Sequence, residues 1–334
     1  MKKGGEERIL IIKTSAIGDI VRTFPAVSAV RREFPGARID YLVGREYAGL
    51  LADCPHVSEV IPYDKRRNFE DVAGFLRFLA SIRGRKYTVA LNLQNNTRCE
   101  MIARASGAAR RTRIVNITRP MDGVEGVFEI LKTTGINTAE RDYEFWTSEE
   151  DERFAAEFAE ANGLSGGEPV IGLNPGVAWP SRRWPLEHFA TLADRAREEL
   201  GARALIFGGP GEIDRAESIA AAMSAPPVIA AGKTTLLQAG ALMRRCAAFV
   251  SNDSGLMHIS AMCRVPTVGL FGPSTPDIAR PSGPGHKALY LALPCAPCYK
   301  HDCPKSTTEC MSGIAPDAVF KELEQIIRIN KRSS

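Results

Sequence analysis

The chain has 334 residues, more than a single hydrophobic core usually supports, so its length predicts two domains. Its composition, 44% hydrophobic and 25% charged, is that of a globular protein and excludes a disordered or fibrous one. No apolar run approaches the roughly 20 residues that cross a bilayer, and the first eight residues lack the apolar core of a secretory signal. We therefore expect a cytoplasmic protein with reduced cysteines.

The net charge of +4 lies wholly in the N-terminal half. Residues 1–150 hold 24 Lys+Arg against 20 Asp+Glu, whereas residues 151–334 hold 19 of each. Most such charges are simply solvated, but a basic lobe also favours an anionic acceptor or peripheral contact with an anionic membrane surface. No aromatic residues are interleaved with the basic ones, which argues against a nucleic-acid partner.

Apolar runs of strand length alternate with amphipathic stretches along the first half, which is typical of parallel βαβ units. We expect buried strands at 8–13, 38–43, 57–63 and 87–93. We expect the helices between them at 17–34, 69–82 and 98–106.

The pattern then restarts after an expected helix at 149–162. The polar segment LSGGEP at 164–169 predicts the join between an N-terminal domain, 1–165, and a C-terminal domain, 166–334. In the second domain we expect strands at 170–174, 202–207, 228–231, 247–251 and 267–271. The expected helices are at 186–200, 212–223, 236–246, 256–263 and 317–329. Two doubly wound α/β sheets predict a ligand crevice at the carboxyl ends of their strands.

The segment KTSAIGD at 13–19 joins the first expected strand to the first helix. It places Asp19 near a helix start, where a carboxylate within hydrogen-bond reach can accept the proton of an acceptor hydroxyl. The same carboxylate can instead cap the helix, and the spacing alone favours neither interpretation. Lys13, at the strand end, is a candidate for donor binding.

The segment NPGVAWPSRRWP at 174–185 follows the first strand of the second domain. Gly176 lets a ligand approach the backbone, and the guanidinium groups of Arg182 and Arg183 match the oxygens of a diphosphate. The alternative is that both arginines are solvated residues over a packed Trp.

The segment FGGPGE at 207–212 repeats this design after the next strand. Gly209 leaves the strand end open, and Glu212 lies where it can accept hydrogen bonds from ribose hydroxyls. The chain has neither the dinucleotide fingerprint nor a Walker A loop, which argues against a dehydrogenase and a P-loop kinase.

A third segment, VSNDSGLMHISA at 250–261, takes a strand through a turn into a helix. The first amides after Asp253, Ser254 and Gly255 form a site for a phosphate at the helix N-terminus. Asp253 can instead cap those amides, and His258 is as compatible with a packed side chain as with a ligand contact.

Taken in order, ILIIKTSAIGD, NPGVAWPSRRWP, FGGPGE and VSNDSGLMHISA resemble the heptosyltransferases of lipopolysaccharide inner-core synthesis, glycosyltransferase family 9. The resemblance runs over nearly the whole chain. It implies the GT-B fold, two Rossmann-like domains facing a central cleft, with the acceptor in the first and ADP-heptose in the second. It also implies inverting transfer to a lipid-anchored core oligosaccharide, at a heptose or Kdo, without a cofactor or a catalytic metal.

The resemblance also implies roles for single residues. Asp19 is expected to act as the general base, and Arg182 stands where a family lysine contacts the donor phosphates. Glu212 is expected to face the donor ribose, while Asp253, with Ser254 and Gly255, is expected to bind near the diphosphate. An inverting single displacement requires one base and no enzyme nucleophile.

The chain departs from the first-heptose type of the family in two places. Val177 and Ala178 replace hydroxyl residues, and Arg22 stands where a histidine often follows the Gly-Asp pair, which leaves the exact donor and acceptor open. A late cysteine-rich segment looks more like the second-heptose type. Its C-x2-C-x4-C-x6-C spacing suits either a metal site or a reduced structural loop, at Cys295, Cys298, Cys303 and Cys310.

Two other functions remain open from the sequence. One is a related GT-B glycosyltransferase that uses another nucleotide sugar for a different surface glycan. The other is a non-catalytic, two-lobed ligand-binding protein, against which the missing signal peptide argues.

Overall fold

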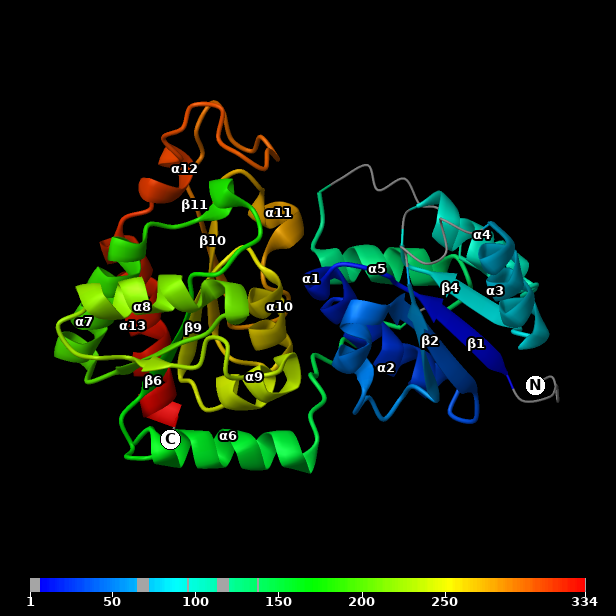
Figure 1. Ribbon diagram of the computed structural model, residues 1–334, viewed down its shortest axis with the longest axis horizontal. Helices are drawn as coiled ribbons and strands as arrows, with labels where there is room; N and C mark the ends of the chain where they lie inside the picture. The colour runs from blue at the N-terminus through cyan, green and yellow to red at the C-terminus, as the bar shows by residue number, and fades with distance from the viewer. Residues whose placement is uncertain (1–6, 65–71, 95, 113–119, 137, 334) are drawn as a thin grey trace. The chain divides into compact units, whose positions relative to one another are not determined.

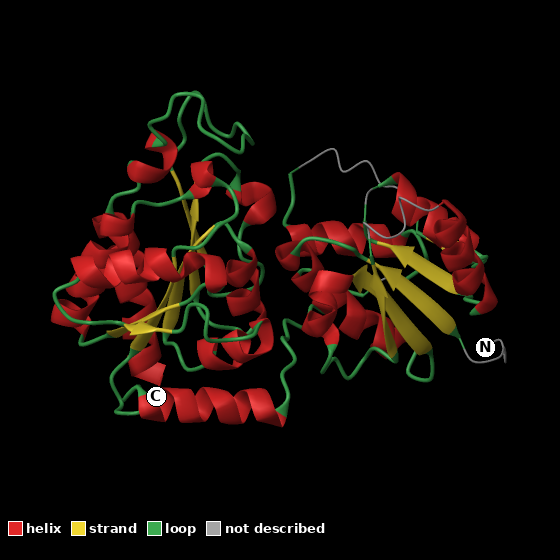
Figure 2. Ribbon diagram, viewed as in Figure 1, coloured by secondary structure: helices red, strands yellow, loops and turns green. Residues whose placement is uncertain are grey.

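The computed structural model describes residues 7–333 except 65–71, 95, 113–119 and 137. The chain divides into two compact units, Met1–Trp146 and Thr147–Ser334 (Figure 1). Within each unit, helices flank both faces of a sheet (Figure 2). None of the helices in the described ranges is long and apolar enough to span a lipid bilayer.

The sheet of the first unit is parallel throughout its described residues, in the order β3-β2-β1-β4-β5. Its strands are β1 (Arg8–Ile12), β2 (Arg38–Gly44), β3 (Glu59–Tyr63), β4 (Val89–Asn92) and β5 (Arg110–Arg111). Its helices are α1 (Ile17–Val21), α2 (Phe24–Glu33), α3 (Val72–Gly84), α4 (Thr97–Ala105) and α5 (Gly123–Lys132), with the 3-10 segment η1 (Arg45–Leu51). The strand order reverses between β1 and β4, and ligands bind at such a switch point in doubly wound folds.

Alternating side chains of β1 explain why helices cover both of its faces. Leu10 and Ile12 belong to a core that includes Ile82 of α3 and Ile102 of α4. Ile9 and Ile11, which point the other way, are also buried. A strand buried on both faces reads as a continuous apolar run, as RILII does here.

The sheet of the second unit is also parallel in its described residues, in the order β11-β10-β9-β6-β7-β8. Its strands are β6 (Val170–Asn174), β7 (Arg203–Ile206), β8 (Val228–Ile229), β9 (Ala248–Asn252), β10 (Thr267–Phe271) and β11 (Lys287–Tyr290). The switch point lies between β6 and β9, the strands that precede the Arg-Arg and Asp-Ser-Gly segments.

The helices of the second unit begin with α6 (Glu149–Ala161), α7 (Leu186–Leu200), α8 (Ile213–Ala222), α9 (Leu236–Met243) and α10 (Gly255–Met262). They end with α11 (Pro276–Ala279), α12 (Glu309–Ser312) and α13 (Pro316–Ser333). Two 3-10 turns, η2 (Pro180–Arg182) and η3 (Pro210–Glu212), lie in the segments that follow β6 and β7. One core joins α7, α8 and α13 to the sheet, around Trp184, Phe189 and Phe320.

The expected strands are present, with ends that differ by a few residues. The single helix expected at 17–34 is wrong, because α1 ends at Val21 and α2 begins at Phe24. Pro25 is the physical reason: it has no N–H to continue the hydrogen-bond ladder but fits the first turn of a new helix. Strands β5 and β11 and helices α5, α11 and α12 were not expected, and positions 69–71 of the helix expected at 69–82 lie outside the described residues.

The segment 164–169, at which we expect the domain join, lies inside the second unit. The division falls between Trp146 and Thr147 because α6 packs against α9. Arg244, which follows α9, also donates to the Thr147 hydroxyl at 2.8 Å.

Candidate active site

The Asp19 turn of the first unit is fixed by cations rather than by a helix cap. The N-cap of α1 is Ala16, and no side chain caps that helix. Instead, the Asp19 carboxylate accepts a hydrogen bond from Arg22 at 2.5 Å and lies 3.7 Å from the Lys13 ammonium. Its side chain stays 42% exposed, so the carboxylate is both oriented and open to solvent.

Lys13 is much less exposed than its partner. Its side chain is 12% exposed, and burial lowers its pKa, an effect that the nearby Asp19 carboxylate opposes. Lys13 therefore contributes a partly buried charge directly behind the carboxylate. Its expected contact with the donor stays a prediction.

The turn after β1 is tied to the turn after β4. The Gln94 side-chain oxygen accepts from the backbone N–H groups of Thr14 at 3.2 Å and Ser15 at 3.3 Å. The Thr14 hydroxyl also lies 3.8 Å from the Cys99 sulfur. Residues about 80 positions apart in the sequence thus form one wall beside Asp19.

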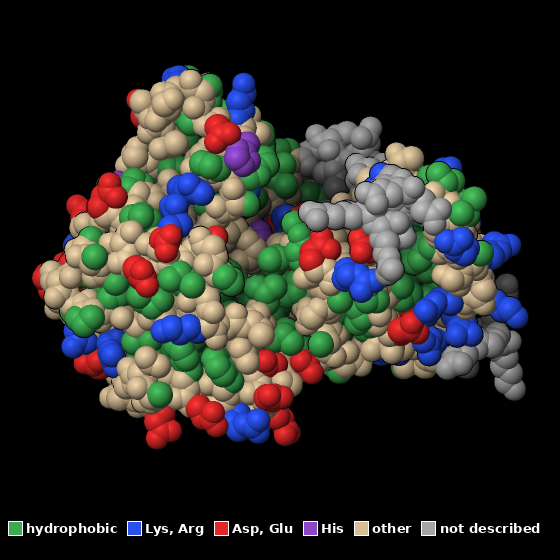
Figure 3. All heavy atoms as spheres, viewed as in Figure 1, with side chains coloured by type: hydrophobic (Ala, Val, Ile, Leu, Met, Phe, Trp, Pro, Cys, Tyr) green, Lys and Arg blue, Asp and Glu red, His purple; other side chains and the backbone are tan. Residues whose placement is uncertain are grey.

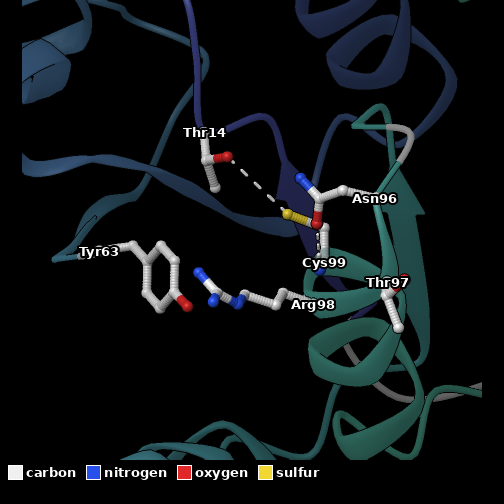
Figure 4. A pocket seen from close by; sticks show the side chains of 6 residues that line it. All are labelled: Thr14, Tyr63, Asn96, Thr97, Arg98 and Cys99. Atoms are coloured by element: carbon white, nitrogen blue, oxygen red, sulfur yellow. Dashed lines mark hydrogen bonds between the residues drawn. The ribbon is translucent and has the colours of Figure 1, made fainter. Parts of the chain in front are cut away.

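A cavity of about 340 Å³ opens at this place. Figure 4 shows the Arg98 side chain extending toward the ring of Tyr63, while the Thr14 hydroxyl faces Cys99. The lining residues come from the ends of β1 and β3 and from the start of α4: Thr14, Tyr63, Asn96, Thr97, Arg98 and Cys99. The cavity therefore presents a guanidinium, hydroxyls and an aromatic ring, which suits a polar ligand with an acidic group.

The sequence analysis missed this cavity except for the segment that contains Thr14. The signal was the polar segment that follows the strand expected at 87–93. The carboxyl ends of parallel strands meet at one edge, so the side chains just beyond them gather there.

In the second unit, the turns after β6 and β9 are joined by buried amides. Asn174 donates to the Ser251 hydroxyl at 2.8 Å and to the Ser254 hydroxyl at 2.7 Å. Asn252 donates to the carbonyl of Pro175 at 2.9 Å and accepts from the backbone N–H of Trp184 at 3.1 Å. The Arg-Arg segment and the Asp-Ser-Gly segment therefore form one surface at the switch point.

Arg182 and Asp253 form an ion pair in this surface. The guanidinium lies 2.9 Å from the carboxylate and stacks 4.1 Å from the centre of the Trp179 ring. Asp253, which is 5% exposed, also accepts a hydrogen bond from Ser274 at 2.6 Å. Arg182 is thus held in place rather than solvated, and the packed residue that the sequence suggested is Trp184, which is fully buried.

The N-terminus of α10 keeps its donors. Its N-cap is Ser254, whose side chain makes no capping hydrogen bond, while the Asp253 carboxylate pairs with Arg182 and accepts from Ser274. The first amides, from Gly255 onward, therefore remain available to an anion. His258 of the same helix is 4% exposed, and its expected contact with the donor stays a prediction.

The Glu212 side chain contacts two segments, its own turn after β7 and the turn after β6. Its carboxylate accepts from the backbone N–H of Gly209 at 2.8 Å. A Cβ atom at Gly176 would lie 2.8 Å from Glu212 Cγ, so the side chain passes directly over the bare glycine backbone. The structure thus brings Gly176, Gly209 and Glu212 together at one edge of the sheet.

Two further arginines, Arg183 and Arg215, lie at the same edge. Arg215 was not predicted from the sequence. Arg215 lies in the first turn of α8, one helical turn beyond Glu212. Burial lowers its pKa, and the positive charge of Arg183 lowers it further, while Glu212 acts in the opposite direction. The signal in the sequence was the i, i+3 spacing from Glu212 on an expected helix.

The late cysteines form no metal site in the described part of the chain, where no three His, Cys, Asp or Glu side chains lie close enough to hold an ion. All eight cysteines are free thiols. Hydrogen bonds from the backbone N–H groups of residues 305–308, led by that of Thr308, lower the pKa of Cys303, whereas burial raises that of Cys310. The metal-site and reduced-loop interpretations both stay predictions.

Comparisons with known proteins identify the family. The model of glycosyltransferase family 9 (heptosyltransferase) matches residues 75–308, more than two thirds of the chain. The chain belongs to this family. It is therefore a glycosyltransferase, which decides against the non-catalytic ligand-binding alternative.

Relatives match over nearly their whole length. Lipopolysaccharide heptosyltransferase 2 of Escherichia coli strain K12 is 27% identical, with 96% of this chain and 98% of that protein covered. A solved family 9 glycosyltransferase from Veillonella parvula DSM 2008 is 26% identical with a TM-score of 0.86, covering 96% of this chain and 97% of that one. The solved ADP-heptose lipopolysaccharide heptosyltransferase II of E. coli is 24% identical with a TM-score of 0.79, covering 97% and 99%. The expected GT-B class, with two Rossmann-like units, is confirmed.

Proposed function

We propose that this family 9 glycosyltransferase transfers heptose from ADP-heptose to the inner-core oligosaccharide of lipopolysaccharide, at a heptose or Kdo, with inversion. One observation carries the proposal. The segments that resemble the family's donor site converge at the carboxyl edge of β6, β7 and β9, where they combine a fixed arginine, an uncapped helix N-terminus and a carboxylate beside bare glycine. These are the groups that a nucleoside diphosphate requires.

We assign the donor to the second unit and the acceptor to the first. The cavity lined by Thr14 and Arg98, in the same unit as Asp19, supports the acceptor assignment, because Arg98 suits an acidic sugar such as Kdo. In the proposed step, Asp19 takes the proton of the acceptor hydroxyl while that oxygen bonds to the anomeric carbon. The bond from that carbon to the phosphate oxygen breaks, and ADP leaves with the electron pair.

Positively charged side chains and backbone amides support this step. Lys13 and Arg22 hold the Asp19 carboxylate in one orientation. In the second unit, Arg182 and the first amides of α10 stabilise the negative charge that develops on the leaving diphosphate.

Asp19→Asn tests the base directly. The amide keeps the shape of the side chain but cannot accept the proton, so turnover should fall by roughly two to four orders of magnitude. Binding of ADP, measured by calorimetry, should stay at the wild-type value because the donor groups lie in the second unit. Asp53→Asn changes a partly exposed carboxylate of the same unit, outside the Asp19 turn, and is the matched control. Near-normal turnover of Asp19→Asn would remove the residue from the mechanism.

A related enzyme that uses another nucleotide sugar is the remaining alternative. Sugar specificity depends on the placement of a few side chains, so the donor has to be measured. Release of ADP, UDP and GDP from a panel of nucleotide sugars separates the two cases. Release of UDP or GDP in preference to ADP would overturn the proposed donor.

The proposal includes peripheral contact with the cytoplasmic face of the inner membrane, where a lipid-anchored acceptor would lie. Lys and Arg side chains gather toward the right-hand edge of the first unit in Figure 3, in agreement with the excess of basic residues in that half. Co-sedimentation with liposomes should increase with anionic lipid content and decrease with salt. Binding that is insensitive to both would exclude the electrostatic contact.

A further inference from the structure

The guanidinium groups of Arg183 and Arg215 have no anionic partner among the described residues. Neither side chain makes an ion pair within 4.0 Å or a hydrogen bond with another described residue. The Nε atoms of both are buried and have no hydrogen-bond partner. Most partly buried arginines in proteins are paired, since an unpaired buried charge is unfavourable.

The two side chains lie at the same edge of the second unit. Arg183 directly precedes Trp184 and the start of α7, and Arg215 lies in the first turn of α8, which packs against α7. The charge of Arg183 acts on Arg215 strongly enough to lower its pKa more than Glu212 raises it. Two like charges are thus placed close to each other at one edge of the unit.

Glu212 does not neutralise this pair. Its Oε2 atom is already bound to the backbone N–H of Gly209, and its side chain lies over Gly176. Arg182 is committed to Asp253 and to the Trp179 ring. Asp253 therefore offsets the charge of Arg182, which can still contact a phosphate, whereas the charges of Arg183 and Arg215 are not offset by an ion pair with any described residue.

We propose that Arg183 and Arg215 form an anion site that binds the diphosphate of the nucleotide donor. A diphosphate carries at least two negative charges and oxygens that match two guanidinium forks, so its binding replaces a repulsion by two charge-assisted contacts. Arg215 extends the donor site to α8. That helix is separate from the segment that contains Arg182 and Arg183. This inference rests on the proposed use of a nucleotide sugar.

Arg215→Gln separates a ligand site from a structural role. Removing one of two repelling charges should leave the melting temperature of the free protein unchanged or slightly raised. The same variant should bind ADP about 10- to 100-fold more weakly, the loss expected for charged hydrogen bonds, while its affinity for adenosine stays at the wild-type value. Arg215→Lys keeps the positive charge but not the two-pronged guanidinium. Its affinity for ADP should lie between those of the wild type and Arg215→Gln.

Arg197→Gln is the matched control. Arg197 lies on α7 of the same unit, is 46% exposed and pairs with Glu168, so its substitution makes the same change of net charge away from this edge. Its affinity for ADP should equal that of the wild type. Equal ADP affinity for Arg215→Gln and Arg197→Gln overturns the inference, as does an equal loss of ADP and adenosine affinity by Arg215→Gln.

Inorganic pyrophosphate distinguishes failure of this inference from failure of the proposed donor. If the wild-type protein binds pyrophosphate but prefers UDP or GDP to ADP, the donor is wrong, and loss of pyrophosphate binding by Arg215→Gln still supports the anion site. If pyrophosphate and every nucleoside diphosphate fail to bind the wild-type protein, the anion site itself is refuted.

Discussion

Gly176→Ala tests whether the bare backbone beside Glu212 is needed for donor binding. The added Cβ would lie 2.8 Å from Glu212 Cγ and 3.0 Å from Cδ, whereas ordinary contacts begin at 3.4 Å. The carboxylate arm therefore has to retreat by at least about 0.6 Å, which lengthens and weakens its 2.8 Å bond to the Gly209 N–H. A hydrogen bond to a charged group contributes about 1.5–3 kcal/mol.

If Glu212 faces the donor ribose, this loss corresponds to a rise of roughly 10- to 100-fold in the KM for the nucleotide sugar. The kcat should change much less, because the ribose is remote from the bond that breaks. Steady-state kinetics with varied donor concentration measure both constants.

Gly211→Ala is the matched control for this experiment, since a Cβ at Gly211 meets nothing within 4 Å. It lies in the same turn as Glu212 and should leave the KM within about twofold of the wild type. If Gly176→Ala and Gly211→Ala have the same KM, the carboxylate does not contact the donor, and the reasoning from the glycine contact is refuted.

Two further predictions concern the orientation of Asp19 and the pH dependence of stability. A Cβ at Gly123 would lie 2.7 Å from Arg22 Cζ, so Gly123→Ala should displace Arg22 from Asp19. We expect kcat to fall roughly tenfold while the affinity for ADP stays unchanged. An unchanged kcat would contradict this prediction. Burial lowers the pKa of His286 to about 4, and its Nδ1 atom accepts from the Thr267 N–H at 3.2 Å, so the folded protein favours the neutral ring. The unfolded chain binds this proton more tightly than the folded protein. The contribution of His286 to the free energy of unfolding is therefore complete above about pH 6.5 and decreases as the pH falls toward 4. The loss is about 1 kcal/mol at about pH 5.5. Urea unfolding of His286→Gln should lack this decrease, and a pH profile identical to that of the wild type would show that the ring does not titrate in this way.

The sequence by itself determined most of the strands and helices and the segments that follow the strands, although it did not predict β5, β11, α5, α11 or α12. Local periodicity is sufficient for this, because a strand such as RILII, buried on both faces, can only be a continuous apolar run. The segments that contain Asp19, Arg182, Glu212 and Asp253 could therefore be singled out from the order of residues alone. Pro25 also marks the break between α1 and α2 in the sequence. We did not predict this break, because apolar residues continue on both sides of Pro25.

The tertiary structure decided which of those residues meet and which partners they take. Thr14 and Cys99 line one cavity, Arg182 pairs with Asp253, and Arg183 acts on Arg215, although these pairs are separated by between 32 and 85 positions. Periodicity reports only the face of an element, whereas such contacts depend on strand order, register and the path of each loop. Contacts of this kind arise only when non-adjacent strands come together at the switch points of the two sheets.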